Sequence, residues 1–290
     1  MRRLTGISLA ILALTCPVSI LAEDVAATPA VAESQRESRF IIVDGGRNLR
    51  DVGGYKTENG RHVRWQRLFR SGSPGNLTDA GRQVFAQLGA EAIIDLRSTA
   101  ERKTDRGDWL KSQPGYWTRD YDLGFGNLSS VFADPSKVTG ETVRRFMADG
   151  YRKTIDEQAP AYRRLFLQLG KAKRPVVVNC TAGKDRTGVA TALVLRSLGV
   201  PYDTVRQDFL LSNNAPGMDG LRRSMGAQAA GKGSTMPPEV MTLLSGVDGS
   251  YLDAAFDEID RKYGSLDQYL AKGLGLSRAD IKAVRRNMVK

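Results

Sequence analysis

The sequence predicts an α/β fold with a mostly parallel central sheet flanked by helices. Short β-branched runs such as Val176 to Val178 have the composition and length of buried strands. Longer segments with helical periodicity separate these runs, which is the pattern of α/β proteins with parallel sheets. The length of 290 residues allows one large domain or two small ones.

The elements are assigned in chain order from hydrophobic periodicity and from capping and turn residues. Thr78 and Ser277 occupy the cap positions of two helices, and Gly60 lies in a hairpin. The glycine-rich segment 215–233 is predicted to be mobile with weak helix, and the loop that ends at Pro135 is expected to close over the site. The expected strands are 40–43, a pair within 61–71, 91–96, 116–121 and 175–179, and the expected helices are 78–88, 142–155, 160–169, 187–195, 202–212, 237–244, 251–263 and 277–288.

The first 22 residues have the features of a secretory signal peptide. Arg2 and Arg3 precede an apolar stretch, and Ala22 ends a plausible cleavage site. Lipoprotein processing at Cys16 is disfavoured because Thr15 precedes it. We therefore expect a signal peptide at 1–22, a disordered linker at 23–39 and one folded domain at 40–290, exported to the periplasm or outside the cell.

The net charge limits the classes of substrate and partner that suit this chain, and the number of cysteines indicates how the thiol is used. Removal of residues 1–22 takes away two cations and no acidic residue, so the formal charge falls from +11 to +9. Such an excess suits an anionic substrate or peripheral contact with an anionic membrane. Nucleic acid is disfavoured because no basic run is interleaved with aromatic residues. Cleavage also leaves Cys180 as the only cysteine, which is the usage of a reactive thiol rather than of a disulfide scaffold.

A cysteine and an arginine flank the turn between a buried strand and a buried helix. Cys180 follows the strand at 175–179, and Arg186 stands after five intervening residues, just before the Ala- and Leu-rich helix. Loop amides and the positive end of a helix converge at such a turn, where they bind anions and favour a thiolate. The pattern therefore predicts nucleophilic attack by sulfur on a phosphoryl group.

The other residues of this loop suit the same chemistry. The planar fork of Arg186 can hold two phosphate oxygens, Gly183 lets the backbone turn with its amide inward, and Thr187 can donate its hydroxyl to the sulfur. A nucleotide-binding loop is excluded because Val178 and Asp185 replace the Gly and the Ser or Thr of that pattern. A rhodanese-type sulfurtransferase remains a weaker alternative.

Residues 180–188, Cys-Thr-Ala-Gly-Lys-Asp-Arg-Thr-Gly, resemble the active-site loop of the cysteine-dependent bacterial tyrosine, dual-specificity and lipid phosphatases. Three upstream stretches (48–55, 68–71 and 94–98 with Glu101) and the later stretch 208–212 resemble further motifs of this family. The likeness extends over residues 40–290. One position differs, because the family usually has His where this chain has Asn179.

The resemblance implies a three-layer tyrosine-phosphatase-like fold with extra C-terminal helices and a reaction through a phosphocysteine, without metal or cofactor. It assigns catalysis to Cys180, Asp185 and Arg186. It assigns substrate binding to Thr181, Ala182, Gly183, Lys184 and Thr187.

Several assignments stay open. The general acid is Asp185 or an Asp of the irregular region (Asp120, Asp122 or Asp134), and Asp95 with Arg97 is either functional or a structural pair. The leading function is a phosphatase for phosphotyrosine proteins or one of dual specificity. The alternatives are a phosphoinositide or inositol-phosphate phosphatase and, because of the Asn for His replacement, a catalytically weak phosphate-binding module.

Overall fold

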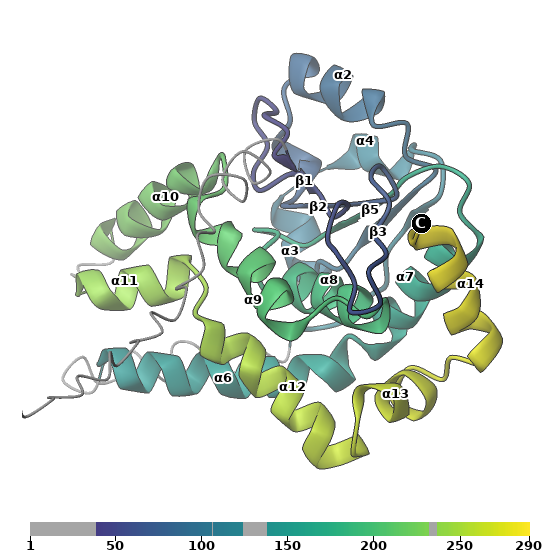
Figure 1. The fold of residues 1–290 in the computed structure, drawn as a ribbon. Helices are drawn as coiled ribbons and strands as arrows, with labels where there is room; N and C mark the ends of the chain where they lie inside the picture. Colours follow the sequence, from purple (N-terminus) through teal and green to yellow (C-terminus); the bar gives the residue numbers. More distant parts are fainter. Residues whose placement is uncertain (1–38, 106, 124–137, 232–236) are drawn as a thin grey trace, which may run out of the picture.

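The computed structural model of the chain describes residues 39–105, 107–123, 138–231 and 237–290. A five-stranded sheet lies at its centre, in the order β1-β2-β5-β3-β4 (Figure 1). Only β1 runs antiparallel to its neighbour, and the other pairs are parallel. The strands are β1 (Arg50–Asp51), β2 (Leu68–Ser71), β3 (Ala92–Asp95), β4 (Tyr116–Trp117) and β5 (Val176–Asn179).

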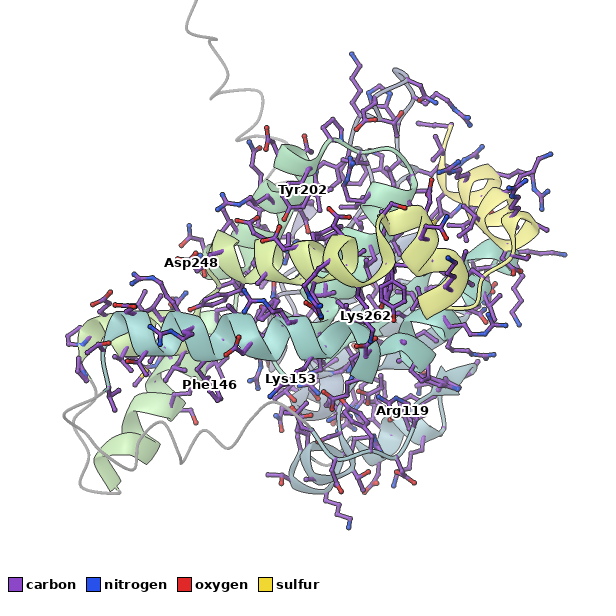
Figure 2. All side chains as sticks on the ribbon, turned by 90° about the horizontal axis from the view of Figure 1, so that it is seen from below. Arg119, Phe146, Lys153, Tyr202, Asp248 and Lys262 are labelled. Atoms are coloured by element: carbon purple, nitrogen blue, oxygen red, sulfur yellow. The ribbon has the colours of Figure 1, made fainter. Side chains whose placement is uncertain are left out.

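Helices cover both faces of the sheet and form a large additional layer. Those of the first half are α2 (Asp79–Gln87), α3 (Thr99–Thr104), α4 (Asp108–Lys111), α6 (Gly140–Glu157) and α7 (Ala159–Lys171). Those of the second half are α8 (Arg186–Ser197), α9 (Tyr202–Leu210), α10 (Met218–Gly231), α11 (Pro238–Ser245), α12 (Gly249–Tyr263), α13 (Leu266–Gln268) and α14 (Arg278–Met288). Helices α6 and α12 run side by side (Figure 2).

The two faces of the central strands bury separate clusters because side chains alternate along a strand. Phe69, Ile93 and Val177 pack with residues of α2 and α4 on one face. Val176 and Val178 belong to the main core with residues of α6, α7 and α8. The three-layer α/β architecture with extra C-terminal helices is therefore confirmed.

All eight expected helices are confirmed, and their ends differ from the expected ones by at most two residues. The Thr78 cap is present, since its Oγ1 accepts from the Gly81 amide at 3.1 Å. Ser277 forms a reciprocal capping box with Asp280. The strand at 91–96 is confirmed as β3, and the one at 175–179 as β5.

Two expectations were wrong. Segment 40–43 is not a strand, because only Phe40 pairs, in an isolated bridge with Arg50. The pair expected within 61–71 is reduced to β2 and a bridge between Lys56 and His62. The weak helix expected within 215–233 is present as α10, and the mobility expected there stays a prediction. The strand expected at 116–121 is present but spans two residues.

Residues 1–22, most of the linker and most of the loop that ends at Pro135 lie outside the described residues. Arg39, expected at the end of the linker, is buried and donates to the carbonyls of Asp51 and Gly53. Within the described ranges, no helix combines the length and apolar composition needed to cross a membrane.

Candidate active site

Cys180 lies directly after the central strand β5, at the carboxyl edge of the parallel sheet. Ser71, Asn179 and Asp95 end three adjacent strands in register, and this edge is where α/β sheets place their ligand sites. The thiol is free and 1% exposed. The turn between the strand and α8 therefore sets Cys180 at the base of the loop 181–185.

Gly183 is required by the shape of this loop. Its φ is +69°, a region that disfavours other residues, and an added Cβ would lie 2.4 Å from the Gly72 nitrogen and from the Ser71 carbonyl carbon. Its carbonyl oxygen accepts from Asn48 Nδ2 and Arg70 Nη2, each at 2.9 Å. Two of the upstream motifs thus hold the loop in place.

Arg70, which contacts Gly183, also belongs to a buried ionic group. We call this group the Asp208 cluster: Arg50, Tyr55, Arg70 and Asp208. Arg70 Nη1 donates to Asp208 Oδ2 at 2.7 Å, and Tyr55 Oη donates to Asp208 Oδ1 at 2.8 Å. Arg50 Nε lies 3.3 Å from Oδ1. Burial opposes the charged carboxylate, but Arg50 and Arg70 outweigh it and hold the pKa of Asp208 well below its ordinary value.

A second ionic group, the Glu101 cluster (Glu101, Tyr121, Thr181 and Arg186), lies beside the thiol. Arg186 Nη1 and Nη2 donate to the two carboxylate oxygens of Glu101 at 2.6 Å each, a bidentate pair. Nη1 also contacts the Leu96 carbonyl at 3.0 Å and Tyr121 Oη at 2.9 Å. Arg186 Nε has no hydrogen bond within the described part of the chain. Glu101 therefore fixes the orientation of the guanidinium, which retains N–H donors that can bind an anion.

Local sequence explains why Glu101 stands at this point. Ser98 and Glu101 form a capping box at the start of α3, with Glu101 Oε2 accepting from the Ser98 amide at 2.8 Å. Burial works against the ionised carboxylate, yet hydrogen bonds from Arg186 and Thr181 lower the pKa of Glu101 to about 2. Burial likewise opposes the charge of Arg186, but Glu101 and the Cys180 sulfur raise its pKa well above the ordinary value.

Lys184 and Asp185 are joined to each other and to the helical layer. Lys184 Nζ donates to Asp185 Oδ1 and to the Gly246 carbonyl, each at 2.9 Å. Tyr151 Oη on α6 donates to Asp185 Oδ1 at 2.7 Å. Asp185 precedes α8 without capping it through its side chain, and its second carboxylate oxygen, Oδ2, has no hydrogen bond to any described residue.

Asn179, in place of the family's usual His, is tied to the neighbouring strand. Asn179 Nδ2 donates to Asp95 Oδ1 at 3.0 Å, and its own Oδ1 is buried without a partner in the described structure. Asp95 is held by Arg97 through Nε and Nη2 and by the Tyr116 hydroxyl. Of the two options for Asp95 and Arg97, the structural pair is the one observed.

The structure also places the remaining expected residues. Thr187 Oγ1 is buried with no hydrogen-bond partner within the described ranges, and Ala182 packs under Ala215 and Met218. Asp120 is 87% exposed and contacts Arg102. Asp134 lies outside the described residues. Across the described ranges, no group of three or more His, Cys, Asp or Glu side chains is placed to hold a metal ion.

Sequence reasoning missed the roles of several residues around the loop. Glu101, Asn48, Arg70 and Asp208 stood in family-like motifs without an assigned role, and Tyr121 and Tyr151 carried no signal. The charge pattern held a clue: arginines and acids that recur at strand ends are seldom buried unless they pair.

Comparisons with known proteins agree with this geometry. Residues 41–290 match the model of a tyrosine phosphatase family. A Cupriavidus necator protein provisionally named a tyrosine-protein phosphatase is 31% identical over 255 residues, covering 88% of this chain and 90% of that protein. The triple specificity protein phosphatase PtpB of Mycobacterium tuberculosis is 32% identical over 272 residues, covering 83% and 96%. A tyrosine-protein phosphatase of Nostoc commune is 26% identical over 227 residues, covering 75% and 72%. The chain belongs to the tyrosine phosphatase family.

Proposed function

We propose that this chain hydrolyses phosphomonoesters through a phosphocysteine, with phosphotyrosine in proteins as its main substrate. The observation that carries the proposal is Cys180 at the base of an amide-lined loop beside Arg186, whose guanidinium is oriented by Glu101. Loop amides and the arginine stabilise charge on the phosphoryl oxygens where it develops, and such preorganised donors usually make the largest contribution to the rate.

The reaction proceeds in two displacements. Cys180 thiolate forms a bond to phosphorus while the ester oxygen leaves and takes a proton from Asp185. Water then attacks phosphorus and gives a proton to Asp185, the sulfur–phosphorus bond breaks, and inorganic phosphate leaves. The uncommitted Oδ2 of Asp185 carries that proton, because Oδ1 already accepts from Tyr151 and Lys184. The unpartnered Thr187 hydroxyl is available to the departing thiolate.

The burial of Cys180 and the contacts of Lys184 both favour phosphotyrosine as the substrate. Because Cys180 is 1% exposed, a long phosphotyrosine side chain suits the site better than a short phosphoserine. The ammonium of Lys184 is committed to Asp185 and Gly246 and is 6% exposed. It is therefore poorly placed to contact a second phosphate, which favours phosphotyrosine over a phosphoinositide.

One panel of assays tests the proposal. The full chain and its Cys180→Ser variant are compared on p-nitrophenyl phosphate, a phosphotyrosine peptide and phosphoinositide vesicles, with mass spectrometry of acid-quenched enzyme. We expect turnover of the first two substrates, a phosphate adduct on Cys180, and loss of both in the variant. Turnover that survives Cys180→Ser contradicts the mechanism. Preference for the vesicles shows a lipid phosphatase instead, and binding without turnover shows a phosphate-binding module.

We also propose export, on the pattern of a charged start, an apolar stretch and a cleavage site at residues 1–22. Mass spectrometry of the protein recovered from the cell envelope or the medium is expected to show a chain that begins at Glu23. An intact Met1 start in the mature protein contradicts it.

A further inference from the structure

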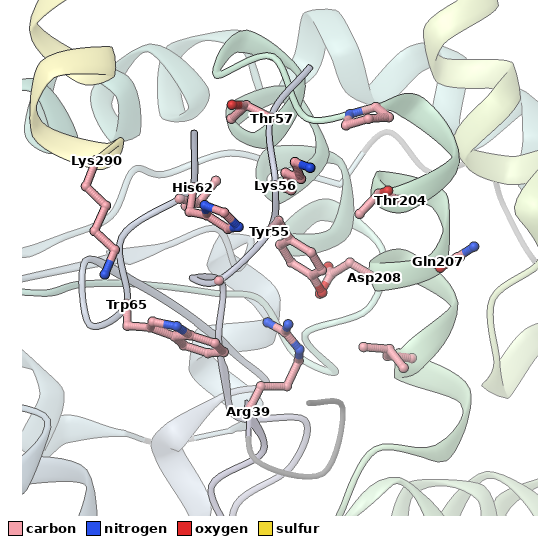
Figure 3. Close-up of a pocket in the computed structure, with 14 residues that line it drawn as sticks. Arg39, Tyr55, Lys56, Thr57, His62, Trp65, Thr204, Gln207, Asp208 and Lys290 are labelled. Carbon is pink, nitrogen blue, oxygen red and sulfur yellow. The ribbon is translucent and has the colours of Figure 1, made fainter. Parts of the chain in front are cut away.

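A large hollow in the described structure lies apart from the catalytic loop. It has a volume of about 780 Å³ and is bordered by segment 54–65, α9 and Lys290, with Arg39 at its base (Figure 3). None of the loop residues 180–187 lines it. The catalytic reaction proposed above therefore gives this pocket no role.

Arg39 carries unused hydrogen-bonding capacity at this pocket. Its side chain is 4% exposed, and its guanidinium lies over the rings of Tyr55 and Trp65, at 4.2 and 5.2 Å from their centroids. Nη1 donates to two backbone carbonyls, whereas Nε is buried without a partner and Nη2 has no hydrogen bond to any described residue. A buried donor left unsatisfied is costly, so an acceptor entering the pocket is favoured.

The charges around the pocket are mainly positive. Lys56, Lys290 and Arg39 line it with His62, and Figure 3 shows their side chains around one hollow. Among the described lining side chains the one carboxylate is that of Asp208, which is bound to Arg50, Arg70 and Tyr55. The nearby Asp51 carboxylate accepts from the amides of Gly53 and Gln66. The pocket therefore attracts an anion rather than a cation.

Part of the remaining wall is apolar, beside the polar Thr57, Thr204 and Gln207. Val63, Pro201 and Leu211 line the hollow, and Trp65 at its rim is 40% exposed, one of few large apolar side chains so exposed among the described residues. Small-molecule sites combine such an apolar lining with a few placed polar groups. An occupant with an apolar group beside its anion is therefore favoured over a bare ion.

We propose that this pocket is a second ligand site that binds a small organic phosphate, with the phosphate on Arg39 and Lys56 and the apolar group against Pro201 and Leu211. A guanidinium together with an ammonium suits a phosphate, which offers three oxygens. No residue of the catalytic loop 180–187 lines this site, and the reaction proposed for that loop does not use it.

Phenylphosphonate, which has no ester bond for the enzyme to cleave, is the probe. The indole N–H signals of Trp65, Trp109 and Trp117 are followed by NMR on the ¹⁵N-labelled full chain, with Trp65→Phe for assignment. We expect a saturable shift of the Trp65 signal. Lys56→Ala, an exposed position, is expected to weaken binding about two- to fivefold. Arg39→Met is expected to weaken it at least about tenfold.

The controls separate this pocket from the catalytic loop. Arg186→Met, which removes the phosphate-binding fork of the loop, is expected to leave the Trp65 titration unchanged, as is Lys111→Ala on α4. Inorganic phosphate is expected to bind more weakly than phenylphosphonate. The proposal is overturned if Trp65 does not respond, if Arg186→Met removes the response, if Lys56→Ala leaves the affinity unchanged, or if inorganic phosphate binds equally well. Lys56→Ala keeps the test valid should Arg39→Met fail to fold.

Discussion

The Asp208 cluster and the Glu101 cluster both join arginine to a carboxylate, yet their exposure differs. In the Asp208 cluster the side chains of Arg50 and Arg70 are 0% exposed and that of Asp208 is 2% exposed. In the Glu101 cluster the side chain of Arg186 is 8% exposed and that of Glu101 is 22% exposed. The same chemistry therefore serves two purposes: the closed cluster fixes the backbone of the loop, and the partly open one presents a cation to a substrate.

The largest effect is expected from breaking the closed cluster with Asp208→Asn. This change leaves two buried guanidinium groups without their counter-charge, and removal of one partner from a buried pair costs about 3–5 kcal/mol. Urea unfolding at pH 7 is expected to show a loss of this size in the free energy of unfolding.

Asp253→Asn is the matched control for Asp208→Asn. Asp253 pairs with Arg206 at side-chain exposures of 38% and 40%, and exposed pairs contribute about 0–1 kcal/mol. Equal losses in the two variants would show that burial of the Asp208 cluster adds nothing to stability.

The two clusters also show which features can be predicted from the sequence: contiguous elements can be, whereas ion pairs between distant residues cannot. The strand at 175–179, the helix after Arg186 and the position of Cys180 follow from a β-branched run, a glycine and an Ala-rich segment that are contiguous in the chain. Local propensity and turn chemistry are sufficient for such features. The ion pairs are different, because Arg70 and Asp208 are separated by 138 residues. Nothing local distinguishes a buried arginine from an exposed one.

The substitution at Asn179 shows the same limit. Sequence comparison identifies it as a departure from the family pattern, but its contact with Asp95 depends on the register of β3 beside β5. Register, rather than composition, decides this contact.

An intermediate effect is expected from Glu101→Gln in the more open cluster. Because the pKa of Glu101 is lowered from 4.5 to about 2 in the folded protein, its charge stabilises the fold above pH 4.5 and this contribution is lost as pH falls toward 2. The shift corresponds to about 3 kcal/mol. Urea unfolding is expected to show this difference between wild type and variant at pH 7, narrowing steadily below about pH 4.5. A difference that stays constant between pH 3 and pH 7 would mean that the variant acts through packing rather than charge.

The smallest effect is expected from Tyr151→Phe, which removes the hydroxyl that donates to Asp185 Oδ1. The Tyr151 hydrogen bond to Oδ1 contributes about 1 kcal/mol, and its loss frees the carboxylate to turn away from the leaving oxygen. A phenol leaving group needs a proton from Asp185, whereas a nitrophenolate leaves readily without one. We therefore expect kcat/KM for phenyl phosphate to fall about five- to tenfold while that for p-nitrophenyl phosphate changes little. Asp185→Asn is expected to show the same selectivity with a larger loss. If Tyr151→Phe lowers both rates equally, Tyr151 supports the whole loop, and the proton comes from another residue.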